Sequence, residues 1–328
     1  MNKAANLRRS RWVRAGISIL VSGGLLSILI ARLDLAVLRQ SIADIHISVL
    51  GAAMLMYGLF LFIGSLRWRV ALKESVIDIP FVVMLRASLV GHVFNMAFFG
   101  PVGGDLAKTA AYSRWHNYEV HDLLATAAVD RSFSVFGSIL LFLFTLVLLF
   151  MSPTLSSFTL MPEGEIENQY LLLALLAALA ISLVGMRLRR RPFFGQLFSA
   201  FAEIAKALHR APVKLLTGCF LGFAGQVLSS FILLVGLIAV TYPEAACTDV
   251  LWAYPLVAAI AALPFSVGGA GLREGAALLF LGNCGAAPEQ IVVAGLLVLL
   301  TYVLWGVIGI PVLLWEEYHH GKSEAAAP

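Results

Sequence analysis

The chain has 328 residues, of which 60% are hydrophobic and only 13% are charged, and its formal net charge at pH 7 is +4. This composition, with a mean hydropathy of +0.90, excludes a soluble globular domain and predicts an all-α polytopic membrane protein. The sequence holds no nucleotide fingerprint and no metal-ligand spacing, so we expect no cofactor, no metal site and no nucleic-acid partner.

A helix needs about twenty mostly apolar residues to cross a bilayer, and six segments meet that requirement. They are approximately residues 13–31, 47–66, 123–150, 170–186, 213–240 and 289–315. The first segment follows a cluster of Lys and Arg, as in a signal peptide, but Arg32 rather than a small-residue cleavage site follows it. We therefore predict that it is retained as the first span.

Lys and Arg concentrate in the cytoplasmic loops of membrane proteins. The N-terminus, residues 67–73 and residues 187–214 are rich in both, whereas the loops 152–169 and 241–249 carry acidic residues and neither Lys nor Arg. This pattern predicts that both termini are cytoplasmic in a multi-pass protein, which we expect in the bacterial inner membrane.

Two segments, 105–122 and 193–210, alternate apolar and charged residues at helical spacing. We predict that they form helices lying on the cytoplasmic surface. The second falls within the basic stretch 187–214, which either determines the topology or is attracted to anionic lipid.

Two further apolar segments, 79–99 and 250–282, are interrupted by Gly and Pro and are not simple spans. By the topology above, the chain from residue 79 enters from the cytoplasm, breaks near residues 100–105 and returns, because three glycines and Pro101 do not continue a helix. The chain from residue 250 enters from the outside, breaks and returns outside. We therefore expect six full spans and two opposed re-entrant pairs of half-helices.

The two breaks share the tripeptide Val-Gly-Gly, which begins at Val102 and at Val267, an offset of 165 residues. The same offset moves the predicted span 123–150 onto 288–315. Because one half has three crossings, we predict an inverted repeat of residues 13–150 and 170–315 within a single transmembrane domain, residues 1–328. A chance match of Gly pairs in a Gly-rich chain is the alternative.

Broken backbone at membrane depth is tolerated only where it is buried in protein or lines a wet cavity. Helix ends at such a break expose amide N–H groups with partial positive charge, and glycines let an anion approach them closely. Opposed breaks therefore predict a cradle for an anion such as a phosphate. The glycines that would shape it are Gly103, Gly104, Gly268, Gly269 and Gly271.

Polar side chains inside the first broken segment are candidate ligand contacts, because ionisable groups at membrane depth are expensive and usually functional. His92 and Asn95 are three residues apart and share a helix face. Arg86 lies off that face, so it either contacts a head group or extends to the cytoplasmic interface.

The adjacent residues Asp130 and Arg131 lie in the predicted span 123–150. Neighbouring residues on a helix do not face each other, so each needs its own partner. That partner is either a ligand or one of the charged residues Asp105 and Lys108.

Arg273 and Glu274 follow the second break. Arg suits bidentate recognition of a phosphate. Glu274 is interpreted either as its counter-ion or as a proton carrier.

These motifs together resemble those of a known family, the flippase-like membrane proteins related to the transmembrane region of lysylphosphatidylglycerol synthase. The residues that carry the resemblance are Arg67, Trp68, Asn95, Gly100, Pro101, Gly103, Gly104, Asp105, Lys108, Asp130, Arg131, Pro264, Ser266, Gly268, Gly269, Gly271, Arg273 and Glu274. The likeness covers nearly the whole chain and implies lipid translocation or a related role in envelope-lipid assembly. In lysylphosphatidylglycerol synthase an acyltransferase-like domain follows the membrane region, and since this chain ends at Pro328 we expect no aminoacylation.

We therefore expect a flippase or transporter, not an enzyme, that moves an anionic phospholipid or a polyprenyl-phosphate-linked lipid by alternating access. Its expected partner is the anionic head group of that membrane lipid. The candidate substrate-binding residues, none of them catalytic, are Arg67, Arg86, His92, Asn95, Gly103, Gly104, Asp105, Lys108, Asp130, Arg131, Ser266, Gly268, Gly269, Gly271, Arg273 and Glu274.

Within this set we expect Arg273, Arg131 and Lys108 to contact phosphate, while the carboxylates balance charge or couple transport to protons. Two alternatives stay open from the sequence. One is an intramembrane enzyme that modifies lipid head groups, and the other is a non-catalytic membrane partner of an envelope glycosyltransferase or acyltransferase.

Overall fold

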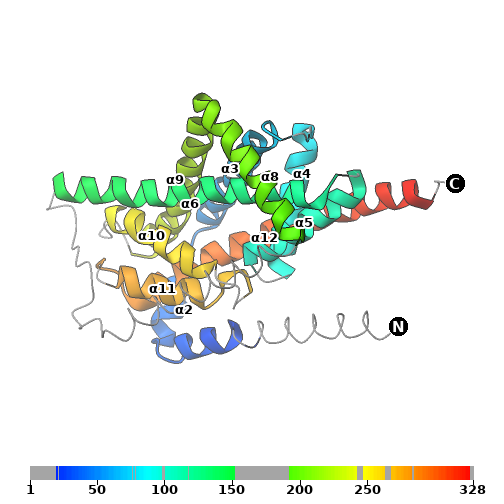
Figure 1. The fold of residues 1–328 in the computed structure, drawn as a ribbon. Helices are drawn as coiled ribbons and strands as arrows, with labels where there is room; N and C mark the ends of the chain where they lie inside the picture. Colours follow the sequence, from blue (N-terminus) through cyan, green and yellow to red (C-terminus); the bar gives the residue numbers. More distant parts are fainter. Residues whose placement is uncertain are drawn as a thin grey trace.

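The computed structural model describes residues 20, 22–75, 77, 79–97, 100–116, 118–151, 192–241, 247–262, 267–282 and 284–325. All regular structure within these residues is helical, as the composition predicts (Figure 1). Residues 22–30 form a first helix. The others are α2 (Leu35–Ala43), α3 (Ile47–Leu72), α4 (Phe81–Ala97), α5 (Gly100–His116), α6 (Val120–Met151), α8 (Pro192–Arg210), α9 (Pro212–Thr241), α10 (Cys247–Ala261), the 3₁₀ turn η2 (Val267–Gly269), α11 (Leu272–Leu281) and α12 (Pro288–Ala325).

Four helices in the described part of the chain are long and apolar enough to cross a membrane, namely Ile47–Leu72, Val120–Leu148, Pro212–Val240 and Pro288–His320. They belong to α3, α6, α9 and α12 and coincide with four of the six predicted spans. The first predicted span is described only from residue 20 onward, and the fourth, residues 170–186, lies outside the described residues.

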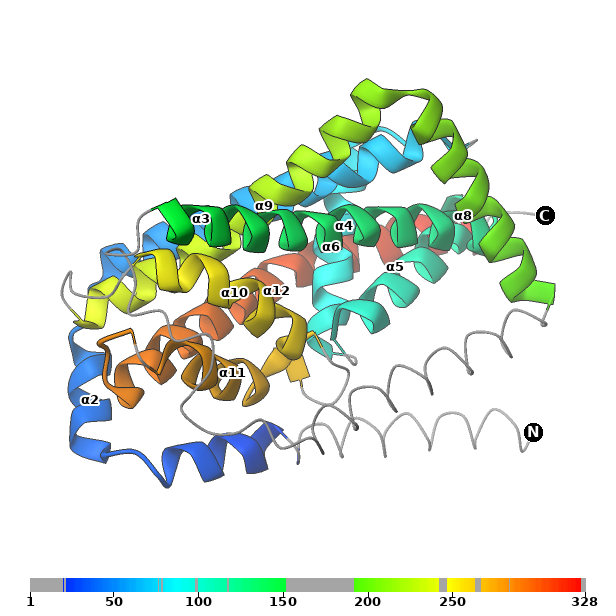
Figure 2. The same cartoon turned by 60° about the vertical axis from the view of Figure 1, so that its left-hand side comes forward.

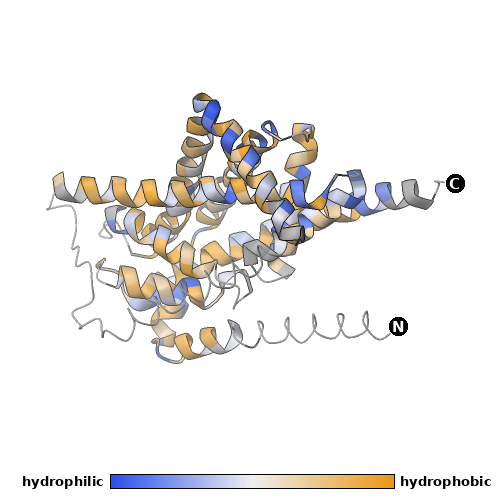
Figure 3. Ribbon diagram, viewed as in Figure 1, coloured by the Kyte–Doolittle hydropathy of each residue, from blue (hydrophilic) through white to orange (hydrophobic). Residues whose placement is uncertain are grey.

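Large apolar side chains point outward along these helices, which are coloured as hydrophobic over most of their length in Figure 3. On α6 the exposed side chains include those of Val135, Ile139, Leu143 and Val147. A contiguous apolar surface of this kind is unstable in water but suits contact with lipid chains. The distribution of apolar side chains therefore supports a membrane-embedded bundle.

The first broken segment forms an antiparallel pair of arms, α4 and α5, but the glycines after Pro101 do not form the break. Helix α5 already begins at Gly100, so Pro101, Gly103, Gly104 and Asp105 are helical. Pro is tolerated in the first turn of a helix, where its missing N–H needs no partner. The prediction that the glycines and Pro101 interrupt the helix is therefore wrong, although α4 ends at Ala97 and α5 begins at Gly100, next to the predicted break near residues 100–105.

Gly104 serves the packing of the two arms. A Cβ atom at this position would lie 1.8 Å from Oδ1 of Asn95 and 2.6 Å from the carbonyl oxygen of Gly91, both on α4. Helix α5 is also more than a surface helix, because Tyr112 and Trp115 are buried in a core cluster with Met84. It is the second arm of a hairpin along α4.

The second broken segment forms the pair α10 and α11, joined through η2. Here the glycines do interrupt the helix, because Gly268, Gly269 and Gly271 have φ angles of 61°, 82° and 81°. Only glycine adopts this left-handed region without cost. The turn η2 packs against both α4 and α5, so the broken ends of the two pairs approach each other near the centre of the bundle (Figure 2).

Helices α6 and α9 cross in close contact, which small residues permit. A Cβ on Gly137 would lie 2.3 Å from the backbone carbon of Gly222, and a Cβ on Gly222 would lie 2.1 Å from the carbonyl oxygen of Phe133. This contact holds α6 against α9.

Helix α8 is amphipathic, as predicted for residues 193–210. Its Ile204 and Leu208 are buried in a cluster with Val129 and Phe133 of α6, whereas Lys206 is exposed. Its apolar face is therefore covered by α6.

Candidate functional site

A cavity of about 230 Å³ lies between the two pairs of broken helices, and its wall is formed by residues of α3, α4, α5, α6, α9, α10, α11 and α12. It brings together predicted site residues that are up to 206 positions apart, from Arg67 to Arg273. The predicted site residues in its lining are Arg67, His92, Asn95, Asp105, Lys108, Asp130, Arg131, Gly268 and Arg273.

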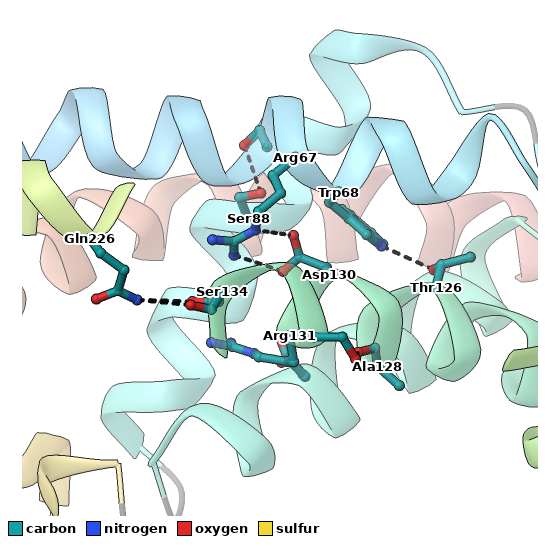
Figure 4. A network of polar contacts seen from close by, with 12 residues as sticks. Arg67, Trp68, Ser88, Thr126, Ala128, Asp130, Arg131, Ser134 and Gln226 are labelled. Carbon is teal, nitrogen blue, oxygen red and sulfur yellow. Dashed lines mark hydrogen bonds and ion pairs between the residues drawn. The ribbon is translucent and has the colours of Figure 1, made fainter. Parts of the chain in front are cut away.

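Arg67 on α3 and Asp130 on α6 form a two-point ion pair across the cavity wall (Figure 4). Nε of Arg67 donates to Oδ1 of Asp130 at 2.6 Å, and Nη2 donates to Oδ2 at 3.0 Å. The two side chains are only 6% and 13% exposed. Because both charges are removed from water and satisfy each other in a fork geometry, the pair fixes α3 against α6.

Asp105 on α5 binds two cations. It accepts from Nε of Arg131 at 2.6 Å and lies 3.3 Å from Nζ of Lys108, one turn further along the same helix. The Lys108 ammonium also sits 4.1 Å from the centre of the Trp68 ring, which stabilises a partly desolvated cation. One carboxylate thus balances two positive charges.

Asp130 and Arg131 have separate partners, as their adjacency on α6 requires. Figure 4 shows Asp130 directed toward α3 and Arg131 directed to the other side of α6. Of the predicted alternatives for Arg131, the structure shows the pair with Asp105.

Arg273 occupies the first turn of α11, directly after the second break. Its Nη2 donates to the carbonyl oxygen of Gly268 at 2.8 Å, whereas its buried Nη1 has no hydrogen-bond partner among the described residues. No carboxylate lies within ion-pair distance of Arg273 in the described residues. This guanidinium is therefore held by backbone at one end and free at the other.

His92 and Asn95 both line the cavity from α4, as their spacing predicts. Nε2 of His92 is 2.9 Å from the carbonyl oxygen of Tyr302 on α12. Oδ1 of Asn95 is buried without a hydrogen-bond partner in the described residues. The cavity therefore holds an unused acceptor as well as an unused donor.

Other predicted residues lie elsewhere. Arg86 does not line the cavity; its Nη1 is 3.7 Å from Oε1 of Glu316, and its guanidinium stacks 4.2 Å from the Trp315 ring. Arg86 was predicted either to contact a head group or to extend to the cytoplasmic interface, and its position gives no support to a contact with a head group in this cavity. Ser266 is outside the described residues.

Glu274 is fully buried, but it is not paired with Arg273. Its Oε2 accepts from the backbone N–H of Gly271 at 2.6 Å, which satisfies one of the free amides at the start of α11. Gly269 leaves room for the Arg273 guanidinium, because a Cβ at position 269 would lie 3.2 Å from Nη2 of Arg273. Gly103, Gly104, Gly269 and Gly271 thus shape the backbone around the cavity rather than line it.

Sequence reasoning missed three tyrosines in the lining: Tyr57 on α3, Tyr254 on α10 and Tyr302 on α12. Tyrosine in membrane helices is enriched at the interfaces, whereas Tyr57 lies within the predicted span 47–66 and Tyr302 near the middle of 289–315. That unusual depth is the signal that identifies them.

The comparisons with known proteins agree with the motifs. A family model described as the lysylphosphatidylglycerol synthase TM region matches residues 16–309. No curated protein and no solved structure matches the chain.

Proposed function

Because the chain belongs to the family of the lysylphosphatidylglycerol synthase TM region, we propose that it moves a lipid with an anionic head group across the bacterial inner membrane without changing it chemically. The observation that carries this proposal is the cavity at the meeting point of the broken helices. It places four cationic side chains and two carboxylates inside a bundle whose surface is apolar. Such a surplus of positive charge at membrane depth is stable only with a counter-anion.

Arg273 is the expected contact for the head group, since its Nη1 is a buried donor with no partner. Arg131 and Lys108 share the single carboxylate of Asp105 and supply the rest of the positive field. Arg67 and Asp130 satisfy each other, so their role is to hold the wall of the cavity.

Movement by alternating access requires two halves that rock around the site, and helix positions support the proposed repeat. Shifted by 165 residues, the bounds of α3 become 212–237 and those of α4 become 246–262, close to those of α9 and α10. The same shift moves α6 onto α12. The packing agrees with it, because α6 packs on α9 and α10, whereas α12 packs on their counterparts α3 and α4. The shift also places Lys108 on Arg273, so the two halves contribute a cation to the cavity lining at equivalent positions.

Native mass spectrometry of the full-length protein, extracted gently from its own membrane, tests this proposal. We expect one anionic lipid to remain bound to the wild type and to be lost from Arg273→Ala. The matched control is Arg69→Ala, which removes an exposed arginine on α3 outside the cavity.

Reconstituted vesicles then test movement, and the expected result is transfer of that lipid between leaflets with its head group intact. Retention of the same lipid by Arg273→Ala would count against the anion site. A chemically altered head group would instead favour an enzyme, and transfer that needs a co-purified glycosyltransferase or acyltransferase would favour a partner role.

A further inference from the structure

The cavity lining carries hydrogen-bonding groups for which the described residues show no partner. Tyr57, Tyr254 and Tyr302 come from three different helices, and all three line the same cavity as Arg273. Tyr254 bonds to Ser229, whereas the hydroxyls of Tyr57 and Tyr302 have no hydrogen-bond partner in the described part of the chain. Together with Nη1 of Arg273 they form a set of three unused donors around one space.

Polar groups inside proteins are almost always paired with protein, water or ligand. Three donors on one wall therefore indicate a ligand group with several acceptor oxygens. A carboxylate offers two oxygens, whereas a terminal phosphate offers three strong acceptors.

The net charge of the lining residues also favours a terminal phosphate. Arg67, Lys108, Arg131 and Arg273 outnumber Asp105 and Asp130 by two when His92 is counted as neutral. A phosphate monoester carries roughly −1.5 to −2 charges at pH 7, which matches that surplus. A phosphodiester carries a single negative charge and leaves one cation uncompensated.

The size of the cavity is consistent with a compact group. A volume of about 230 Å³ equals roughly seven or eight waters at about 30 Å³ each. A phosphate with a few waters fits this space.

We propose that the head group recognised by this cavity is a phosphate monoester, bound by Arg273 together with the hydroxyls of Tyr57 and Tyr302. This inference rests on the proposed function for the anion site and narrows its substrate to a lipid monophosphate, whatever apolar chain bears it. The tyrosines act as specificity-determining residues, because their donors reach the third oxygen that a diester lacks.

Binding of two lipids with identical acyl chains tests the inference on the purified full-length protein. Dioleoyl phosphatidic acid is the monoester probe and dioleoyl phosphatidylglycerol the diester probe, each titrated by native mass spectrometry at pH 7.5. We expect about tenfold tighter binding of the monoester, since a hydrogen bond to a charged group has roughly that effect. Tyr57→Phe and Tyr302→Phe should each remove most of this preference while diester binding persists. Tyr318→Phe, an exposed tyrosine, is the matched control.

Two further measurements, a change of pH and competition by inorganic phosphate, distinguish binding of a lipid monoester from binding of free phosphate. Lowering the pH from 7.5 to 5 should shrink the preference, because the monoester dianion takes up a proton near pH 6 and becomes a monoanion. Inorganic phosphate in excess should compete only weakly, because it lacks the apolar chain. Thermal stabilisation by inorganic phosphate with no binding of phosphatidic acid would overturn the assignment of a lipid.

The outcomes distinguish this inference from the function on which it rests. Equal binding of the two lipids, both lost in Arg273→Lys, overturns the monoester assignment and leaves the anion site in place. Binding of both lipids unaffected by Arg273→Lys overturns the anion site itself. Should Arg273→Lys fail to accumulate, the two Tyr→Phe variants decide the monoester assignment by the ratio of the two affinities.

Discussion

At the scale of single residues, the cavity depends on tightly packed positions at which a larger or uncharged side chain is not accommodated. Gly104 lets α5 approach α4 so closely that Asn95 lies over its Cα. The buried pair of Arg67 and Asp130 is fixed in the same region by two short hydrogen bonds. A substitution at Gly104 or in the Arg67–Asp130 pair is therefore expected to act on the packing of the cavity wall.

Replacing Gly104 with Ala should destabilise the protein by about 1–3 kcal/mol or more, because the new methyl group would lie 1.8 Å from Asn95 Oδ1 and 2.6 Å from the backbone of Gly91. The melting temperature of the purified protein in detergent measures this effect. Gly51→Ala is the control, since its Cβ meets nothing within 4 Å and alanine favours a helix. Equal melting temperatures for the two variants would show that the two arms are not in close contact.

Replacing Asp130 with Asn should cost about 3–5 kcal/mol, because it leaves the buried Arg67 guanidinium without its counter-charge. Asp122→Asn on the same helix is the matched control, since that side chain is 27% exposed and pairs with His121, which is only 24% exposed. A comparison of unfolding in detergent should separate the two variants clearly. An Asp130→Asn protein as stable as Asp122→Asn would contradict the ion pair.

At the scale of elements, helix pairs carry both the apolar packing and the charge pairing. Helix α12 packs against α3, α4, α9 and α11, so it is the element around which the broken pairs are arranged. Its C-terminal part holds Glu316, whose side chain is 3% exposed and faces Arg86 of α4. His320 lies one turn further along and 3.3 Å from the same carboxylate.

Glu316→Gln should loosen α4 from α12 and lower stability by about 1–2 kcal/mol. The cost is smaller than for Asp130 because the Arg86 side chain is 37% exposed and water screens its charge. Glu317→Gln, the exposed neighbour, should leave the melting temperature unchanged. If the two variants melt together, the contact with Arg86 contributes nothing to the packing of these helices.

At the scale of the whole molecule, the orientation in the membrane and the inverted relation of the halves stay predictions. They rest on the placement of Lys and Arg along the chain and on the correspondence of helix bounds after a shift of 165 residues. The described helices meet at one cavity, so the two broken pairs act on a shared space whichever way the protein is inserted.

Cysteine accessibility in sealed vesicles measures the orientation. In a cysteine-free background, Glu163→Cys in the acidic loop should react with a membrane-impermeant maleimide only from the outside. Lys206→Cys, on the exposed face of α8, should react only from the cytoplasmic side. The reverse pattern would overturn the predicted topology and with it the account of how each broken pair enters the membrane.

Much of the candidate site could be predicted because membranes make polar residues conspicuous. His92, Asn95, Asp105, Lys108, Asp130, Arg131 and Arg273 stand out in apolar surroundings, and all of them line the cavity. The need for separate partners at Asp130 and Arg131 followed from helix geometry alone. Tyr57 and Tyr302 were missed because a tyrosine in an apolar run is chemically ambiguous until its neighbours are known.

The helical architecture and the set of polar groups at membrane depth could be predicted from the sequence, because span length and the cost of burying charge are properties of local segments. Which of these polar groups meet could be seen only once the helices were placed in space. Arg67 pairs with Asp130 across 63 positions, Arg86 is drawn away to Glu316, and Glu274 binds backbone instead of Arg273. Partner choice depends on how whole helices pack, and helix packing is set by contacts between segments far apart in the chain.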